Sequence, residues 1–96
     1  MVLEALVLHP KDNVATAVRL LEKGKRISFK DRGNDTDVLL LQIIPFGHKF
    51  ALTDIEPGEK IIKYGEVIGQ ATKSIEKGEH VHVHNVEGLR GRGDRQ

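Results

Sequence analysis

The sequence predicts a mostly β domain built from many short strands, with one short helix in its N-terminal half. A seven-residue pattern (apolar, Glu, any residue, Gly, charged, any residue, apolar) starts at Ile55 and at Ile75, and a weaker copy starts at Leu21. In each copy the glycine can take the left-handed conformation of a tight turn, after which a strand begins. Three such turns in 96 residues leave room for short strands and few long elements.

Short apolar or alternating runs indicate where the strands lie. The polar run at residues 31–35 predicts a hairpin tip, because it separates two strand-like segments. Gly65 and Gly69 predict bends or a bulge later in the chain. The expected strands are residues 2–8, 25–30, 36–44, 48–52, 60–64, 67–72 and 80–85.

One segment has helical rather than alternating spacing. Pro10 ends the first strand, and Asp12 or Asn13 then offers the side-chain oxygen of a helix N-cap. We therefore expect a short amphipathic helix over residues 14–21, which stops before Gly24. The apolar residues that define this spacing are Val14, Ala17, Val18 and Leu21. An alternative interpretation of the same loop is that His9 and the helix N-terminus hold an anion.

Length and charge favour one soluble domain that binds neither nucleic acid nor membranes. The chain has 96 residues, a net charge of +1 and no cysteine, so no strong field attracts phosphates and no thiolate can bind a metal. Glu4 interrupts the apolar N-terminus, and the longest apolar run, residues 38–41, is too short to span a bilayer. We expect a cytoplasmic protein with one domain at residues 1–86 and a flexible tail at residues 87–96.

Three histidines alternate with two valines near the C-terminal end. On an extended strand His80, His82 and His84 would lie on one face, with neighbouring Cα atoms about 6.5–7 Å apart. Two imidazoles at that spacing can bind one divalent metal ion, and His82 with His84 form such a pair. The alternative is a solvated face of an edge strand, on which the histidines are ordinary polar residues.

A second candidate pair, His48 and Lys49, follows the break at Pro45-Phe46-Gly47. His48 could move a proton near neutral pH, and Lys49 could bind a carboxylate as a point charge. Neighbouring residues on a strand face opposite sides, so both serve one site only if the backbone bends, which Gly47 permits. The alternative is a surface lysine beside a partly buried histidine.

Four ordered segments, residues 9–15, 47–55, 62–72 and 80–86, together resemble the N-terminal domain of altronate dehydratase and galactarate dehydratase. The resemblance covers roughly residues 7–94. It implies a SAF domain with a β-clip fold. The ending at residues 87–94 is similar to that of small subunits encoded apart from a large catalytic subunit. The resemblance therefore implies the small subunit of a split hydro-lyase that acts on a sugar acid or related hydroxy acid.

The same resemblance implies roles for five residues. His48 and Lys49 are expected to be catalytic, Lys49 and Asn85 to bind substrate, and His82 and His84 to bind a divalent metal. Fe²⁺ or Mn²⁺ is the expected ion, bound together with the large subunit, which would supply the main base. The isolated chain could also form a homo-oligomer.

Two further functions fit the sequence. The chain could be the small subunit of a sulfolactate sulfo-lyase, in which sulfite leaves instead of water. It could also be a non-catalytic SAF module that binds a small acidic ligand or a protein partner. A third and weaker hypothesis is an accessory protein that stores or delivers a metal ion through the histidines.

Overall fold

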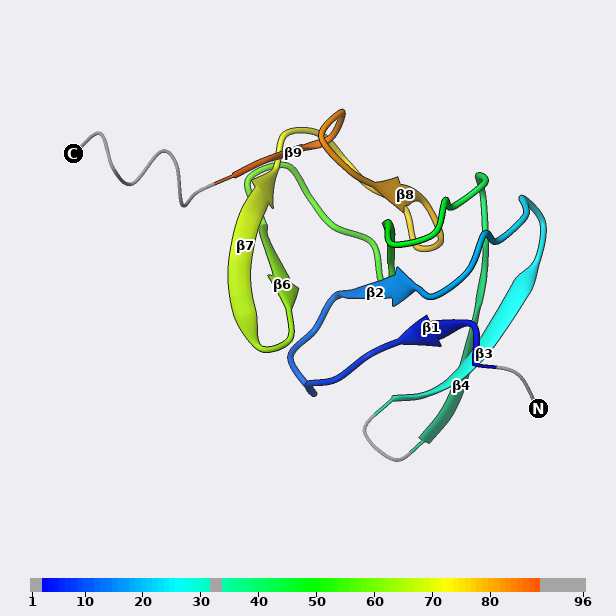
Figure 1. The fold of residues 1–96 in the computed structure, drawn as a ribbon. Coiled ribbons are helices and arrows are strands. Elements are labelled where there is room, and N and C mark those ends of the chain that lie inside the picture. The colour runs from blue at the N-terminus through cyan, green and yellow to red at the C-terminus, as the bar shows by residue number, and fades with distance from the viewer. Residues whose placement is uncertain (1–2, 32–33, 89–96) are drawn as a thin grey trace.

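The computed structural model describes residues 3–31 and 34–88 and contains three antiparallel sheets (Figure 1). The first sheet has the order β1-β2-β5-β8, the second is the β3-β4 hairpin, and the third has the order β6-β7-β9. The strands are β1 (Ala5–Leu6), β2 (Val14–Ala17), β3 (Arg26–Asp31), β4 (Asn34–Leu39), β5 (Lys49–Ala51), β6 (Lys60–Lys63), β7 (Glu66–Ala71), β8 (His80–Val81) and β9 (Val86–Glu87). The predicted mostly β class is confirmed.

A tight turn with a left-handed glycine occurs four times and organises the fold. The glycines are Gly24, Gly47, Gly58 and Gly78, with φ between 83° and 89°, the conformation that position i+2 of a type II turn requires. Three of these turns are the copies expected from the repeated pattern. The fourth, at residues 44–48, has Pro45 where the other copies have glutamate, so the pattern did not include it. We call these four segments the clip turns.

Each clip turn is anchored to a distant segment by two reciprocal backbone hydrogen bonds, and the turns also pair in twos. Gly24 N–H donates to Leu40 O over 2.8 Å, and Leu40 N–H donates to Lys25 O over 2.8 Å. The partner turn repeats this arrangement between Gly47 and Ala17, and the two copies meet at the bridge between Leu21 and Ile44. The second pair of clip turns makes the equivalent bonds from Gly58 to Ala71 and from Gly78 to Ala51, with a bridge between Ile55 and Ile75.

The four-stranded sheet separates two hydrophobic cores. Ala15 and Phe50 are cross-strand partners on one face and belong to the first core. Val14 and Ala51 pair on the other face, where they pack with Ile61 of the β6–β7 hairpin. The alternation of side chains along β2 and β5 therefore supplies both cores from one sheet.

The predicted helix over residues 14–21 is wrong, because Val14–Ala17 form strand β2. This strand pairs with β1 on one side and with β5 on the other. Val14 and Thr16 are β-branched and suit a strand, and pairing on both sides satisfies more backbone groups than an isolated short helix would. Tertiary pairing therefore overrides the helical spacing.

Asp12 and Asn13 are not helix caps but join two loops to each other. Asp12 Oδ1 accepts a hydrogen bond from Gly65 N–H over 2.9 Å, while its Oδ2 accepts one from His9 N–H over 3.2 Å. Asn13 Oδ1 accepts from Ile62 N–H over 2.8 Å, and its Nδ2 donates to the carbonyl of Lys60 over 2.9 Å. These side chains fix the β6–β7 hairpin against the start of β2.

Other predicted boundaries shift in smaller ways. The expected hairpin of residues 25–30 and 36–44 forms as β3 and β4, with a register from Arg26↔Leu39 to Asp31↔Asn34. The predicted flexible tail stays a prediction, since most of it lies outside the described residues. No helix that could cross a membrane occurs in the described part of the chain.

The clip turns differ in how tightly their glycines are packed, which gives a matched test. A Cβ on Gly78 would overlap the carbonyl oxygen of Leu39, whereas a Cβ on Gly24 would meet no atom within 4 Å. Both glycines have left-handed φ. We expect Gly24→Ala to lower the free energy of unfolding by about 1–2 kcal/mol from backbone strain alone. Gly78→Ala should lower it by about 3 kcal/mol or more, because overpacking adds to the strain.

Urea unfolding of the two variants and the parent chain measures this difference. Equal losses for the two alanine variants would show that the packing against Leu39 does not contribute.

Candidate metal and substrate site

Two clip turns bring distant histidines together. His48 follows Gly47 in one clip turn, and His80 lies two residues after Gly78 in another. The pairing of β5 with β8 sets Lys49 opposite Val81 and Phe50 opposite His80. The segments at residues 47–50 and 78–82 therefore lie side by side, at the edge of the sheet where β8 is seen in Figure 1.

The imidazoles of His48, His80 and His82 form a cluster, which we call the histidine triad. Each ring offers a nitrogen that lies within 4.8 Å of the nitrogens of the other two. His48 Nδ1 and His80 Nε2 are 2.8 Å apart, which is a hydrogen bond whose direction depends on the tautomer. The rings of His48 and His82 stack with centroids 4.1 Å apart and planes inclined by 16°. Three converging imidazole nitrogens are a donor set for a divalent metal.

Burial and neighbouring basic groups lower the pKa of two members of the triad, His80 and His82. Desolvation, followed by the neighbouring imidazoles of His48, His84 and His82 and the ammonium of Lys49, lowers the pKa of His80 to about 4. Desolvation and His48 also lower the pKa of His82. The neighbouring groups whose charge lowers these two pKa values are imidazoles and one ammonium, and none is a carboxylate. His80 and His82 are therefore neutral near pH 7, and the basic groups around them favour a negatively charged ligand.

The predicted strand over residues 80–85 is wrong, because β8 ends at Val81 and a turn follows. Asn85 N–H donates to the carbonyl of His82 over 3.1 Å and closes this turn. The Asn85 side chain adds two bonds: its Oδ1 accepts from His82 N–H over 3.0 Å, and its Nδ2 donates to His80 O over 2.9 Å. The Asn85 side chain thus forms hydrogen bonds to backbone groups that the ladder of a longer strand would otherwise satisfy.

Because of this turn, the histidines that lie together are not the pair predicted from the sequence. His82 is in the triad, whereas His84 is exposed and only tilts against His80, with ring centroids 5.2 Å apart. His80, which the sequence argument treated as a neighbour of the expected pair, is at the centre of the cluster. Asn85 is fully buried, so its position is that of a residue that shapes the turn. A direct contact with substrate, as predicted, would require its two side-chain bonds to break.

Lys49 directly follows His48 of the triad and lies on the sheet face that packs against the β6–β7 hairpin. It is half-buried, and it shares a sheet face with its cross-strand partners Thr16 and Val81. Desolvation, followed by the nearby ammonium of Lys63, lowers the pKa of Lys49. Lys63 was not among the predicted site residues, and only the packing of β6 beside β2 could reveal its proximity.

The surface around the triad is apolar and open. Phe46 and Val83 lie on the two turns that carry the histidines, and their exposed fractions are 71% and 81%. The triad is therefore at the surface of this chain rather than in an enclosed cavity.

Removing the Asn85 side chain tests the turn. Asn85→Ala leaves the buried backbone groups of His80 and His82 without their partners, and we expect it to lower the free energy of unfolding by about 2–3 kcal/mol. His84→Ala, in the same turn but exposed, should change it by less than about 0.5 kcal/mol. Chemical denaturation measures both, and similar effects would contradict the role of Asn85.

The depressed pKa of His80 predicts a pH dependence of stability in metal-free protein. The unfolded histidine titrates at 6.5 and the folded one at about 4, so between these values the unfolded chain binds more protons. The free energy of unfolding is therefore highest above pH 6.5 and falls as the pH is lowered toward 4. Urea unfolding between pH 7.5 and 4 in the presence of EDTA measures this slope. The slope should be smaller in His80→Gln, and an unchanged slope would contradict the assignment.

Comparisons with known proteins connect this geometry to a family. The model of the altronate/galactarate dehydratase SAF domain matches residues 3–89. Altronate dehydratase of Escherichia coli (strain K12) is 43% identical over 84 residues, which are 88% of this chain and 16% of that protein. Altronate dehydratase of Bacillus subtilis (strain 168) is 39% identical over 80 residues, or 83% of this chain and 15% of that protein.

A third relative is close to this chain in size. The (2R)-sulfolactate sulfo-lyase subunit alpha of Chromohalobacter salexigens is 36% identical over 85 residues, which cover 84% of this chain and 90% of that subunit. The chain thus spans about a sixth of the two altronate dehydratases but matches nearly all of the sulfo-lyase subunit. Because the family model covers most of its length, the chain belongs to the altronate/galactarate dehydratase SAF domain family.

Proposed function

We propose that this chain is the SAF-domain part of a metal-dependent lyase that eliminates water from a sugar acid or related hydroxy acid, together with a larger catalytic chain. The observation that carries the proposal is the histidine triad, in which His48, His80 and His82 place three nitrogens within 4.8 Å of one another. Membership of the family supplies the reaction class.

The triad fits a first-row divalent metal. Its donors are imidazoles, and the low pKa of His80, about 4, keeps that ring available as a ligand near neutral pH. Fe²⁺ and Mn²⁺ remain the ions we propose. When bound, the metal would stabilise negative charge that develops on substrate oxygens. Three protein nitrogens leave room in the coordination shell for oxygen ligands from the substrate or from the larger chain.

The residues of this chain have complementary tasks in the proposed reaction. His48, His80 and His82 would hold the metal, and Asn85 holds the backbone of the last two in place. Lys49 binds the substrate carboxylate next to the metal, since its charge is close enough to lower the pKa of His80 and of His82. The base that removes the proton next to the carboxylate is assigned to the larger chain. In the elimination the base takes that proton, a carbon–carbon double bond forms, and the hydroxyl takes up a proton from an acid and leaves as water.

Two observations support a larger catalytic chain. The altronate dehydratases contain a region similar to this chain in about a sixth of their length. The sulfo-lyase relative is a subunit by its name and is matched over 90% of its length. The second observation also favours the other candidate, a sulfolactate sulfo-lyase, in which a carbon–sulfur bond breaks and sulfite leaves. A non-catalytic SAF module is the alternative if no metal binds. The cytoplasmic location stays a prediction.

Single alanine substitutions test the metal site. We expect His48→Ala and His82→Ala to weaken Mn²⁺ binding to the isolated chain by about tenfold or more, because each removes one of three ligands. His84→Ala is the matched control, since it lies in the same turn but outside the triad. Isothermal titration calorimetry under anaerobic conditions measures binding of Mn²⁺ and Fe²⁺.

The result for His84 separates the two candidate ligand sets. If His84→Ala weakens binding as much as His82→Ala, the pair predicted from the sequence is the ligand set and the triad is not.

Activity of the chain combined with its larger partner on altronate, galactarate and sulfolactate then identifies the leaving group. Full activity in both His48→Ala and His82→Ala would contradict the proposal.

A further inference from the structure

The two clip turns that meet at the bridge between Leu21 and Ile44 have an apolar outer surface. Leu20 and Ile43 each directly precede a bridge residue. Neighbouring side chains on extended backbone point to opposite sides, so the bridge residues are buried whereas Leu20 and Ile43 are exposed by 52% and 49%. Phe46, in the same pair of turns, is even more exposed. Three large apolar side chains are therefore in contact with solvent on one pair of turns.

The other pair of clip turns shows that the scaffold does not require these apolar side chains. Its two bridge residues are also buried isoleucines, but the residues that directly precede them are Asp54 and Ser74, which are polar and exposed. Before the glycine, where one turn of the first pair has Phe46, these turns have Pro57 and Lys77. An exposed apolar patch that the fold does not need is typical of an interaction surface.

The segment that carries Ile43 and Phe46 is attached to the histidine triad at both of its ends. At one end, Gln42 Oε1 accepts a hydrogen bond from His80 N–H over 2.8 Å. At the other end, His48 Nδ1 lies 2.8 Å from His80 Nε2. The exposed apolar residues of this segment thus lie, in sequence, between two contacts to the same histidine. The apolar patch therefore borders the triad.

A further exposed apolar side chain, Val83, belongs to the turn that carries the third histidine. It directly follows His82, whose ring is stacked on that of His48. Apolar side chains from two separate segments of the chain therefore border the triad. We call this set the apolar rim, and its members are Leu20, Ile43, Phe46 and Val83.

The occupant that the triad favours is the larger catalytic chain of the proposed function. The three members of the triad offer nitrogens and no oxygen donor, so a metal held there needs further ligands from elsewhere. The sulfo-lyase relative, which is matched over 90% of its length, is by its name one subunit of its enzyme. A chain that supplies the missing ligands and the base has to cover the triad, and it then contacts the residues that border it.

We propose that the larger catalytic chain docks on the apolar rim, with an apolar patch of its own against Phe46, and thereby covers the histidine triad. The identity of this partner rests on the proposed function. The location of the surface rests on the exposed side chains and on the two contacts of their segment with His80.

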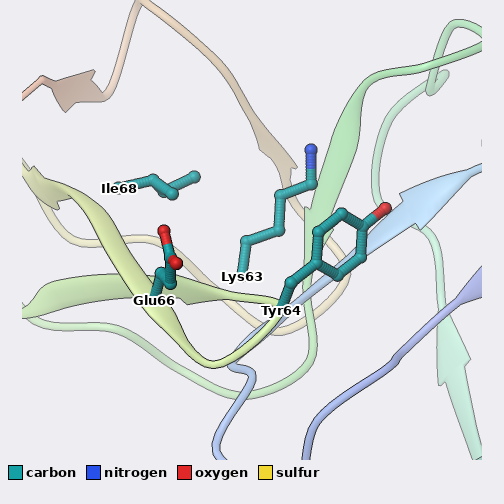
Figure 2. Close-up of a pocket in the computed structure, with 4 residues that line it drawn as sticks. All are labelled: Lys63, Tyr64, Glu66 and Ile68. Atoms are coloured by element: carbon teal, nitrogen blue, oxygen red, sulfur yellow. The ribbon is translucent and has the colours of Figure 1, made fainter.

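The pocket beside the β6–β7 hairpin is a reference region for the test. Figure 2 shows the residues that line it, and none of them belongs to a clip turn or to the triad. They include an ammonium and a carboxylate, so this surface is also more polar than the apolar rim. The lining residues are Lys63, Tyr64, Glu66 and Ile68.

Hydrogen–deuterium exchange locates the docking surface. The larger dehydratase chain of the same organism is co-expressed with this chain, and the purified complex is compared with the isolated chain in EDTA. We expect slower exchange in the complex at residues 42–48 and 82–85 and little change at residues 60–71. Slower exchange at residues 60–71 without any change at residues 42–48 would overturn the proposal.

Serine variants test the apolar rim directly. Phe46→Ser and Ile43→Ser should each raise the dissociation constant of the complex by about tenfold or more, since a few large side chains carry most of the binding energy of an interface. Leu8→Ser is the matched control, because Leu8 is exposed by 63% but lies outside the clip turns, and we expect a change below about twofold. Biolayer interferometry in EDTA measures the constants, and circular dichroism shows that each variant is folded. Equal effects of Phe46→Ser and Leu8→Ser would overturn the proposal.

A second copy of this chain is the alternative occupant of the apolar rim. Sedimentation velocity of the isolated chain should show a monomer. A dimer that dissociates in Phe46→Ser would assign the surface to self-association and overturn the proposal.

The use of EDTA separates the docking surface from the metal site. If the complex forms and the serine variants of the rim bind as tightly as the parent chain, the docking surface fails and the proposed function stands. If the variants weaken the complex while the triad binds no Mn²⁺, the proposed function fails and the docking surface stands. The absence of any complex would contradict both.

Discussion

The fold depends on the reciprocal backbone hydrogen bonds of the clip turns. Each glycine N–H is bonded to a carbonyl of a segment far away in the sequence, and that segment returns a bond to the residue after the glycine. Strands of two to six residues have too few ladder bonds to specify their own positions. The paired turns fix the positions of the strands instead. At the bridges Leu21–Ile44 and Ile55–Ile75, two buried apolar residues lie between the turns of each pair.

The candidate site is a consequence of this scaffold. His48 and His80 come from clip turns of different pairs, and the β5–β8 ladder joins the two pairs. The proposed metal ligand His48 and the proposed carboxylate-binding Lys49 are neighbours, because Lys49 begins β5 directly after the clip turn. The histidines are held by backbone geometry on rigid segments, which is the condition for a preorganised metal site.

The sequence was sufficient for the fold class, the family and three of the four clip turns, because each rests on local patterns or on ordered motifs. It was insufficient where a pattern has two physical solutions. The spacing from Val14 to Leu21 suits a helix, but β1 and β5 pair with this segment on both sides. Alternation at residues 80–85 suits a strand, but the side chain of Asn85 satisfies the backbone in a turn instead.

The same limit applies to predicting which site residues lie together. The sequence predicted His48 as a catalytic residue and His82 as a metal ligand, and both roles stay predictions, whereas the central place of His80 depends on a contact with His48, 32 positions away. Lys63 could not be connected to Lys49 without knowing that β6 packs beside β2. Local patterns show which residues have suitable chemistry, and only long-range pairing shows which of them meet.

The clip turn also separates the requirements of folding from those of chemistry. Its geometry needs a glycine and a buried apolar residue, and the position after the glycine contributes both its backbone N–H and its carbonyl to the scaffold. In the four copies this position is Lys25, His48, Glu59 and Glu79, so one backbone carries a basic, an imidazole and two acidic side chains. At Glu59 and Glu79 the carboxylate accepts a hydrogen bond from the backbone N–H three residues earlier and so closes its own turn, whereas the imidazole of His48 is bonded to His80 in another turn. A single substitution after the glycine can therefore change the chemistry of a clip turn without loss of a turn-closing bond only where the side chain is not itself part of the turn.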